Sequence, residues 1–216
     1  MDERARFRWQ ELETRFNDLV SRCAPDADAA SLYETIADKY SEPHRRYHTL
    51  EHIQHCLSQL DEARHLADDP DALELALWFH DLIYDPTADD NERRSAETFD
   101  SLLGVLMPAE RAVHVHRLIV DTEYPSEPGD RDGQLMVDID LSSFALPWDE
   151  FMRDTENIRS EYSHVPEKRF YAGKLKFLDK LLSRPRFYLT DHFHDRLESR
   201  ARSNIERHIR EVREDH

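Results

Sequence analysis

The residues with the clearest chemical potential are His80 and Asp81, which adjoin each other in the mostly apolar segment 76–85. Burying a charge in such a segment is unfavourable unless the charge is paired. A divalent metal ion would compensate for that cost, because imidazole and carboxylate groups are both ligands of such ions. We expect His52 and Asp140 to be the remaining protein ligands of this ion. The sequence therefore predicts a metal site that consists of His52, His80, Asp81 and Asp140.

The local sequence around the two outlying ligands fits this prediction. His52 lies at the edge of the apolar stripe of its predicted helix, and Asp140 lies between Ile139 and Leu141, which have the character of core residues. Two imidazoles and two carboxylates suit one divalent ion such as Mn²⁺, Fe²⁺, Co²⁺ or Mg²⁺. In an octahedral shell they would leave positions open for water and for a substrate oxygen.

These residues must be positioned by helices, because apolar residues recur every three or four positions along nearly the whole chain. The helix that contains Leu73 to Ile83 is expected to start at Asp69 or Asp71. It is apolar on nearly all sides and should be central and buried. The other helices are expected at about 6–22, 29–40, 50–60 (with Thr49 as its cap), 91–106, from Pro108 through Ile119, 134–145, 148–163, 167–183 and 190–213. No strand pattern or repeat appears. We predict an all-α, single-domain fold over residues 1–216, with 124–133 as its long loop.

Composition excludes several classes of function. The net charge of −17 opposes binding to a nucleic acid polymer, although a metal ion and a few arginines could still admit a small anion. No segment is long and apolar enough to span a membrane, and the N-terminus lacks the apolar core of an export signal. Cys23 and Cys56 cannot build a disulfide framework and are expected to be reduced core residues. We therefore expect a cytoplasmic protein without membrane contact, and its oligomeric state stays open.

The order of the predicted ligands resembles the HD superfamily of metal-dependent phosphohydrolases, whose pattern is H…HD…D on separate helices of an all-α domain. The surrounding sequence is similar to a bacterial subgroup of predicted HD phosphohydrolases, and more distantly to hydrolases of the alarmone (p)ppGpp. The resemblance covers about residues 30–210 and depends most on the segments 42–48, 78–81, 91–96 and 158–162. It implies an HD-type helical bundle and a phosphohydrolase that uses one divalent metal ion.

The chain departs from this pattern directly after the doublet. Where the two-metal branch of the superfamily carries Lys and the nucleoside 5′-phosphatase branch carries Glu, this sequence has Tyr84. Alarmone hydrolases carry Glu-Asp at this place, so Asp85 matches the second acid while the first is missing. Hydrolysis of the alarmone is therefore in doubt without being excluded.

Further residues are expected to act on the substrate. Asp85, or else Glu92, would accept a proton from the attacking water. Positive side chains and one histidine would contact the phosphoryl group: Arg45, Arg46, Arg93, Arg94 and His48. Each assignment has a structural rival. Asp85 precedes Pro86 and suits a turn, His48 and His52 could be a partly exposed pair, and Arg93 and Arg94 could belong to a solvated helix face.

The leading hypothesis is a metal-dependent phosphohydrolase that cleaves a phosphate ester or anhydride of a small phosphorylated metabolite, with a nucleotide as the expected class. The alternative is a non-catalytic module that keeps the metal site, binds a nucleotide and signals its presence to a partner. A third hypothesis is an acidic helical adaptor without any metal.

Overall fold

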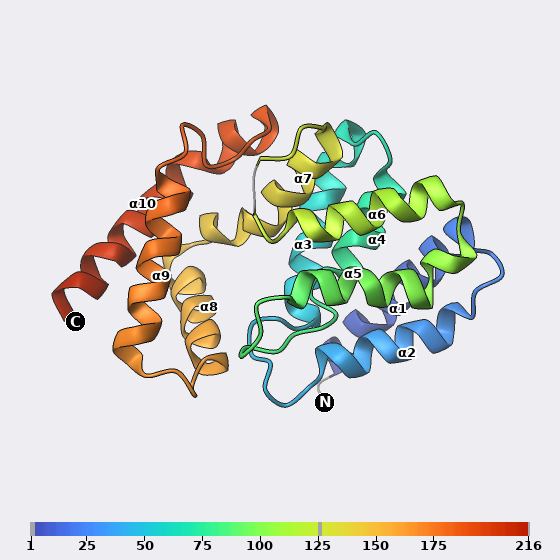
Figure 1. Ribbon diagram of the computed structural model, residues 1–216, viewed down its shortest axis with the longest axis horizontal. Coiled ribbons are helices and arrows are strands. Elements are labelled where there is room, and N and C mark those ends of the chain that lie inside the picture. The colour runs from blue at the N-terminus through green and yellow to red at the C-terminus, as the bar shows by residue number, and fades with distance from the viewer. Residues whose placement is uncertain (1–2, 125–126, 216) are drawn as a thin grey trace.

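The computed structural model describes residues 3–124 and 127–215. Within these ranges it contains α-helices and short 3₁₀ helices but no strand, so the predicted all-α fold is confirmed (Figure 1). The α-helices are α1 (Glu3–Cys23), α2 (Ala29–Tyr40), α3 (Leu50–Ala63), α4 (Pro70–Phe79), α5 (Asn91–Leu102), α6 (Ala109–Asp121), α7 (Arg131–Asp140), α8 (Trp148–Glu161), α9 (Glu167–Leu182) and α10 (Asp191–Asp215). The 3₁₀ helices are η1 (Arg64–Leu66), η2 (Gly104–Leu106) and η3 (Leu141–Ala145).

Helices α1 to α7 form one part of the molecule, and α4 lies at the centre of that part. It packs against α1, α3, α5, α6 and α7, and every residue from Ala72 to Phe79 is buried. The prediction of a central, buried helix is therefore confirmed. The only acid within that buried run is Glu74, and its carboxylate forms ion pairs with Arg15 and Arg64.

Several helix boundaries differ from the sequence-based expectation. Helix α5 ends at Leu102 rather than at 106, and α7 ends at Asp140 rather than at 145, and a short 3₁₀ helix follows each. Helix α4 begins at Pro70 with Asp69 as its N-cap, but it ends at Phe79 rather than at Ile83. Helix α7 begins at Arg131, inside the predicted loop 124–133, because the Asp130 side chain accepts a hydrogen bond from the amide of Gly133. Residues 125–126 of that predicted loop lie outside the described residues.

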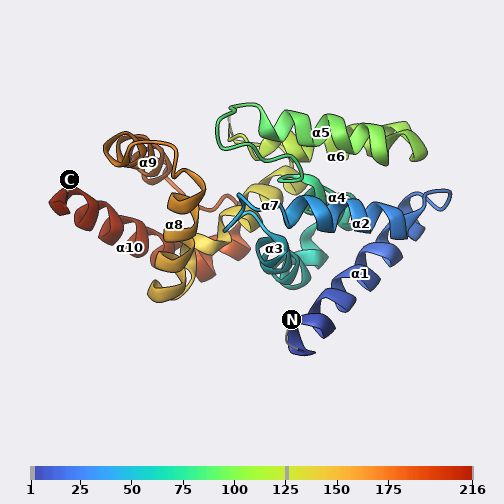
Figure 2. The same ribbon diagram turned by 90° about the horizontal axis from the view of Figure 1, so that it is seen from below.

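Helices α8, α9 and α10 form the other end of the molecule in both views (Figures 1 and 2). Asp138 of α7 ties this end to the rest, because its carboxylate accepts hydrogen bonds from the amides of Leu189 and Thr190. One cluster of buried apolar residues runs from Leu12 to Ile209, which makes the fold a single domain. Among the described helices, none has the length and hydrophobicity needed to cross a bilayer.

Candidate metal centre

The four predicted ligands lie at the ends of three helices. His52 is in the first turn of α3, which begins after Thr49, whose side chain accepts a hydrogen bond from the amide of Glu51. His80 is the C-terminal cap of α4, and Asp81 follows it. Asp140 is the last residue of α7. Because α3 and α7 both pack against α4, these three ends meet.

Each imidazole Nε2 lies within 3.6 Å of a carboxylate oxygen of both acids, and His52, His80 and Asp81 form a group whose ligand atoms all lie within 4.8 Å of one another. The Nε2 atoms of His52 and His80 are 3.3 Å apart. His52 Nε2 lies 3.2 Å from an oxygen of Asp140 and 3.6 Å from one of Asp81, and the corresponding distances from His80 Nε2 are 3.5 and 3.0 Å. Neighbouring ligands that lie about 2.1 Å from a shared ion are themselves roughly 3.0–3.4 Å apart. The donor set therefore fits a divalent cation.

A second interaction fixes the orientation of His80. Its Nδ1 lies 2.9 Å from the carbonyl oxygen of Leu77, one turn earlier in α4. A carbonyl can only accept, so Nδ1 carries a proton, and Nε2 is the atom that faces Asp81 and Asp140 and would bind a metal ion. Such a bond to the outer nitrogen is typical of metal-ligating histidines.

The charges of the four residues are balanced against one another. Burial alone would raise the pKa of Asp81 and Asp140, but the imidazoles of His80 and His52 lower both pKa values well below their usual range. Burial opposes protonation of His80, yet Asp81 and Asp140 raise its pKa well above the usual value. The cluster thus keeps two carboxylates ionised inside the protein, and this negative charge favours a bound cation.

Cys56 lies beside the cluster, one helical turn after His52. Its Sγ is 3.7 Å from His52 Nε2, and with Asp140 these residues form a second group that could hold a metal ion. Burial raises the pKa of the Cys56 thiol well above its usual value. The thiol is therefore a protonated, buried neighbour of the site, in agreement with the predicted core position.

Tyr124 also contacts the centre, and sequence reasoning did not identify it. Its hydroxyl donates a hydrogen bond to Asp140 Oδ2. Its φ of 53° lies in the left-handed region, where a bulky residue is strained. We interpret this backbone conformation as the means by which the ring reaches Asp140 from the segment after α6.

Arg45 does not face the candidate substrate position, so its predicted contact with phosphate is wrong. The side chain is buried, and the guanidinium donates hydrogen bonds to the carbonyl oxygens of Asp81 (2.7 Å) and Leu82 (2.8 Å). It also pairs with Glu42 at 3.1 Å. The physical reason is the end of α4, which leaves these carbonyls without helical partners inside the protein. Arg45 thereby holds the turn that contains Asp81.

The other three predicted arginines are exposed and lie outside the cavity beside the metal centre. Arg46 donates to the carbonyl oxygens of Pro43 and Arg45. Arg93 pairs with Glu123 at 2.8 Å, and Arg94 lies 3.6 Å from Asp90. The structure therefore agrees with the rival hypothesis of a solvated helix face for Arg93 and Arg94, and it corrects the prediction that these three side chains bind phosphate.

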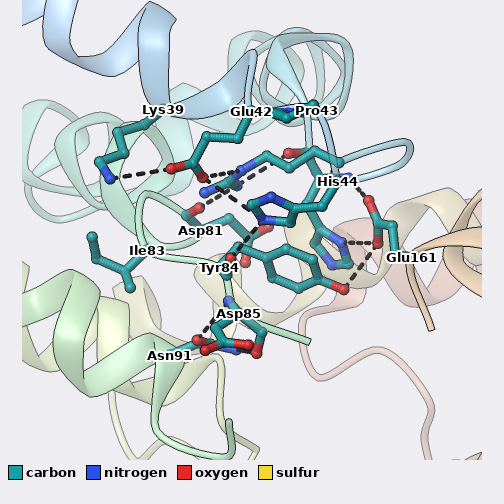
Figure 3. A network of polar contacts seen from close by, with 12 residues as sticks. Lys39, Glu42, Pro43, His44, Asp81, Ile83, Tyr84, Asp85, Asn91 and Glu161 are labelled. Atoms are coloured by element: carbon teal, nitrogen blue, oxygen red, sulfur yellow. Dashed lines mark hydrogen bonds and ion pairs between the residues drawn. The ribbon is translucent and has the colours of Figure 1, made fainter. Parts of the chain in front are cut away.

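His48 does line the cavity beside the candidate metal centre, and contacts with Glu161 hold it there. Figure 3 shows Glu161 beside Tyr84 in this network. Glu161, the last residue of α8, accepts hydrogen bonds from the amides of Arg46, Tyr47 and His48 and from the Tyr84 hydroxyl. His48 Nδ1 lies 2.7 Å from the same carboxylate, and the His48 ring stacks on Tyr84 with centroids 4.1 Å apart. Tyr84 therefore supports His48.

The structure separates the two candidate bases. The Asp85 carboxylate accepts hydrogen bonds from the amide and hydroxyl of Thr87, and these bonds lower its pKa. Asp85 does not line the cavity, so the preference for it as the base is wrong and the turn interpretation holds. Glu92, in the first turn of α5, does line the cavity. Burial, together with the charges of Asp81, Glu123 and Asp140, raises its pKa.

The metal centre opens into a cavity of about 750 Å³ between the two ends of the molecule, a size that suits a small metabolite. Aromatic side chains from both ends line it. Six carboxylates also line it, those of Asp81, Asp89, Glu92, Glu123, Asp140 and Asp154. The basic lining residues, Arg169 and Lys174, both belong to α9, and no motif in the sequence indicated them.

No protein-family model matches this chain, and comparisons with curated proteins and with solved structures also found no match. The chemistry of the site must therefore be inferred from its own geometry.

Proposed function

We propose that the protein is a metal-dependent phosphohydrolase of the HD type that cleaves a phosphate ester or anhydride of a small phosphorylated metabolite, with a nucleotide as the expected class. The observation that carries this proposal is the convergence of His52, His80, Asp81 and Asp140 at ligand spacing beside a metabolite-sized cavity. A divalent ion, when bound, supplies Lewis acidity, which strengthens water as a nucleophile and polarises a phosphoryl oxygen.

The acidic lining explains why an anionic substrate would need a cation. Six carboxylates face the cavity against Arg169, Lys174 and two histidines, so the carboxylates outnumber the basic groups and an added cation would favour the approach of a phosphate. A divalent ion among the four candidate ligands would make the electrostatic potential positive in the part of the cavity next to them. Hydrolysis, in this proposal, depends on metal for binding as well as for chemistry.

Two residues of the chain would act directly on the reactants. Glu92 accepts the proton of the attacking water, since its carboxyl group lines the cavity with a raised pKa. His48 lines the same cavity, and its Nδ1 is held by Glu161. Burial opposes protonation of His48, but Asp81 and Glu161 raise its pKa, and in the doubly protonated ring Nε2 can donate to a phosphoryl oxygen. Tyr84 and Glu161 are positioning residues for His48.

The experiment that tests this function measures phosphate release. Purified protein is incubated with nucleoside mono-, di- and triphosphates and with simple phosphate esters, in the presence of Mn²⁺, Co²⁺, Fe²⁺ or Mg²⁺. We expect release that a chelator abolishes and that Asp81→Asn reduces by at least about 100-fold. Asp68→Asn, which removes an exposed acid that does not line the cavity, serves as the matched control.

Other outcomes select the competing hypotheses. Binding of nucleotide to the metal-loaded protein without any phosphate release would favour the non-catalytic module. Elemental analysis addresses the adaptor hypothesis. A metal content near zero after incubation with each ion would overturn the metal site and the proposed function together.

A further inference from the structure

The end of the cavity formed by α9 has a chemistry different from that of the metal centre. In both views α9 lies on the far side of the molecule from α4 and α5 (Figures 1 and 2). Among the described lining residues, Lys174 and Arg169 of α9 are the only lysine and arginine. The cavity therefore has an acidic, metal-binding end and a basic end.

Lys174 and Arg169 differ in burial. Arg169 is exposed, whereas the ammonium group of Lys174 is buried without a hydrogen-bond partner. Its nearest compensating contact is the ring of Phe170, with Nζ 5.8 Å from the centroid. Burial lowers the pKa of Lys174 to about 8. A buried ammonium that lines a cavity and lacks an anion nearby is expensive to maintain, and an anionic ligand would remove that cost.

Among the described residues, none forms a hydrogen bond with the Lys174 ammonium in place of this anion. His208 of α10 is buried, and both of its ring nitrogens lack hydrogen-bond partners. Burial, together with the charge of Lys174, lowers the pKa of His208 to about 4, so this ring is neutral near pH 7. Arg169 is exposed at the same end, where it would add a second positive charge at the rim.

The wall between the two ends is largely aromatic. Phe144 and Phe151 come from η3 and α8, Phe170 and Phe177 come from α9, and Tyr124 completes the lining near Asp140. The rings of Tyr124 and Phe177 have centroids 6.3 Å apart. Aromatic side chains of this kind stack on planar rings such as nucleobases.

We propose that Lys174, with Arg169 at the rim, binds a second phosphate group of the substrate, remote from the phosphate held at the metal centre. The substrate class is then a molecule with two phosphate groups on one ring-bearing body. This inference rests on the proposed function only in assigning the first phosphate to the metal end. Lysine is a common phosphate ligand, and here it acts as a single charge at the closed end of a cavity.

The test compares two probes that differ by one phosphate, adenosine 5′-monophosphate and adenosine 3′,5′-bisphosphate. Calorimetry measures their affinities for the Mn²⁺-loaded protein in a Glu92→Gln background, which limits consumption of the probes. We expect the bisphosphate to bind at least about tenfold more tightly. Lys174→Met should bring this ratio close to one, whereas Lys176→Met, which removes an exposed lysine of the same helix, should leave it unchanged.

A second readout needs neither turnover nor metal. Acetylation of Lys174 at pH 8, with the exposed Lys176 of the same helix as the reference, reports whether a ligand covers the Lys174 amine. The bisphosphate should protect it more than the monophosphate does, as measured by mass spectrometry of the labelled peptides. A bisphosphate preference that is absent, or that survives Lys174→Met, would overturn the inference.

The two proposals can fail separately. Phosphate release together with an unchanged preference in Lys174→Met would leave the hydrolase in place and remove the second phosphate site. Protection of Lys174 without phosphate release from any substrate would support the second phosphate site and remove the proposed hydrolase.

Discussion

The guanidinium of Arg45 donates a hydrogen bond of 2.7 Å to the backbone carbonyl oxygen of Asp81, a residue that lies 36 positions later in the chain. The same guanidinium binds the carbonyl of Leu82, and α5 provides the complementary contacts. There, the Ser95 hydroxyl accepts from the amide of Ile83, and Asn91 accepts from the amide of Asp85. The turn that carries the metal ligand is therefore held by side chains on both sides.

The first prediction concerns Arg45 as a structural residue. Arg45→Met should lower the free energy of unfolding by about 3 kcal/mol, because it leaves buried carbonyls unsatisfied. It should also weaken Mn²⁺ binding, since Asp81 belongs to the freed turn. Urea unfolding and calorimetry measure the two effects. Arg46→Met, at an exposed position, should change stability by less than about 0.5 kcal/mol. Equal effects of the two variants would contradict this role.

The second prediction separates the two acids that sequence analysis left as candidate bases. Glu92→Gln should reduce kcat by about 10²- to 10⁴-fold, because a general base contributes on that scale. Asp85→Asn should leave kcat within about threefold of the native protein, since its carboxylate bonds to Thr87 outside the cavity. Steady-state kinetics with the same substrate and metal measure kcat of both variants. A larger loss in Asp85→Asn than in Glu92→Gln would reverse the assignment.

The third prediction concerns the hydroxyl that binds Asp140. Tyr124→Phe should weaken Mn²⁺ binding by roughly tenfold, because the carboxylate loses the hydrogen bond that orients it. Tyr47→Phe is the control, because the Tyr47 hydroxyl bonds to Ser143, which is not a predicted ligand. Calorimetric titration with Mn²⁺ measures both affinities. The role fails if the two variants bind the ion equally well.

The fourth prediction uses the pKa of Lys174. Below pH 8 this amine is protonated in the folded and the unfolded chain, so the folded protein bears the full cost of a buried charge. Lys174→Met should therefore raise the free energy of unfolding by about 1–3 kcal/mol at pH 7.

The sign of its pH dependence follows from the same pKa. As pH rises from about 8 towards the ordinary value of 10.5, the folded state loses its proton first and the native protein gains stability. The advantage of Lys174→Met should shrink across that range, whereas Lys176→Met should show no comparable trend. Unfolding in urea at several pH values provides the comparison, and an advantage that grows with pH would contradict the buried-charge interpretation.

Local sequence determined the fold class and indicated the four candidate metal ligands. The periodicity of apolar residues predicted helices because a helix buries one face or, as in α4, all of them. The doublet His80-Asp81 in an apolar segment indicated a metal site because such charges need a compensating ion. His52 and Asp140 could be identified because each combines a ligand-type side chain with apolar neighbours in its own helix.

Only the tertiary structure decided what the other polar residues do. Arg45 carries the same charge as a phosphate-binding arginine, and its burial against the turn after α4 is what makes it structural. Asp85 and Glu92 are both acids near the doublet in sequence, but only Glu92 lines the cavity. Lys174 lies 34 positions beyond Asp140 and meets the cavity because α9 folds back over it. A side chain's type is encoded locally, whereas its solvent exposure and its partners depend on contacts between segments that are distant in the chain.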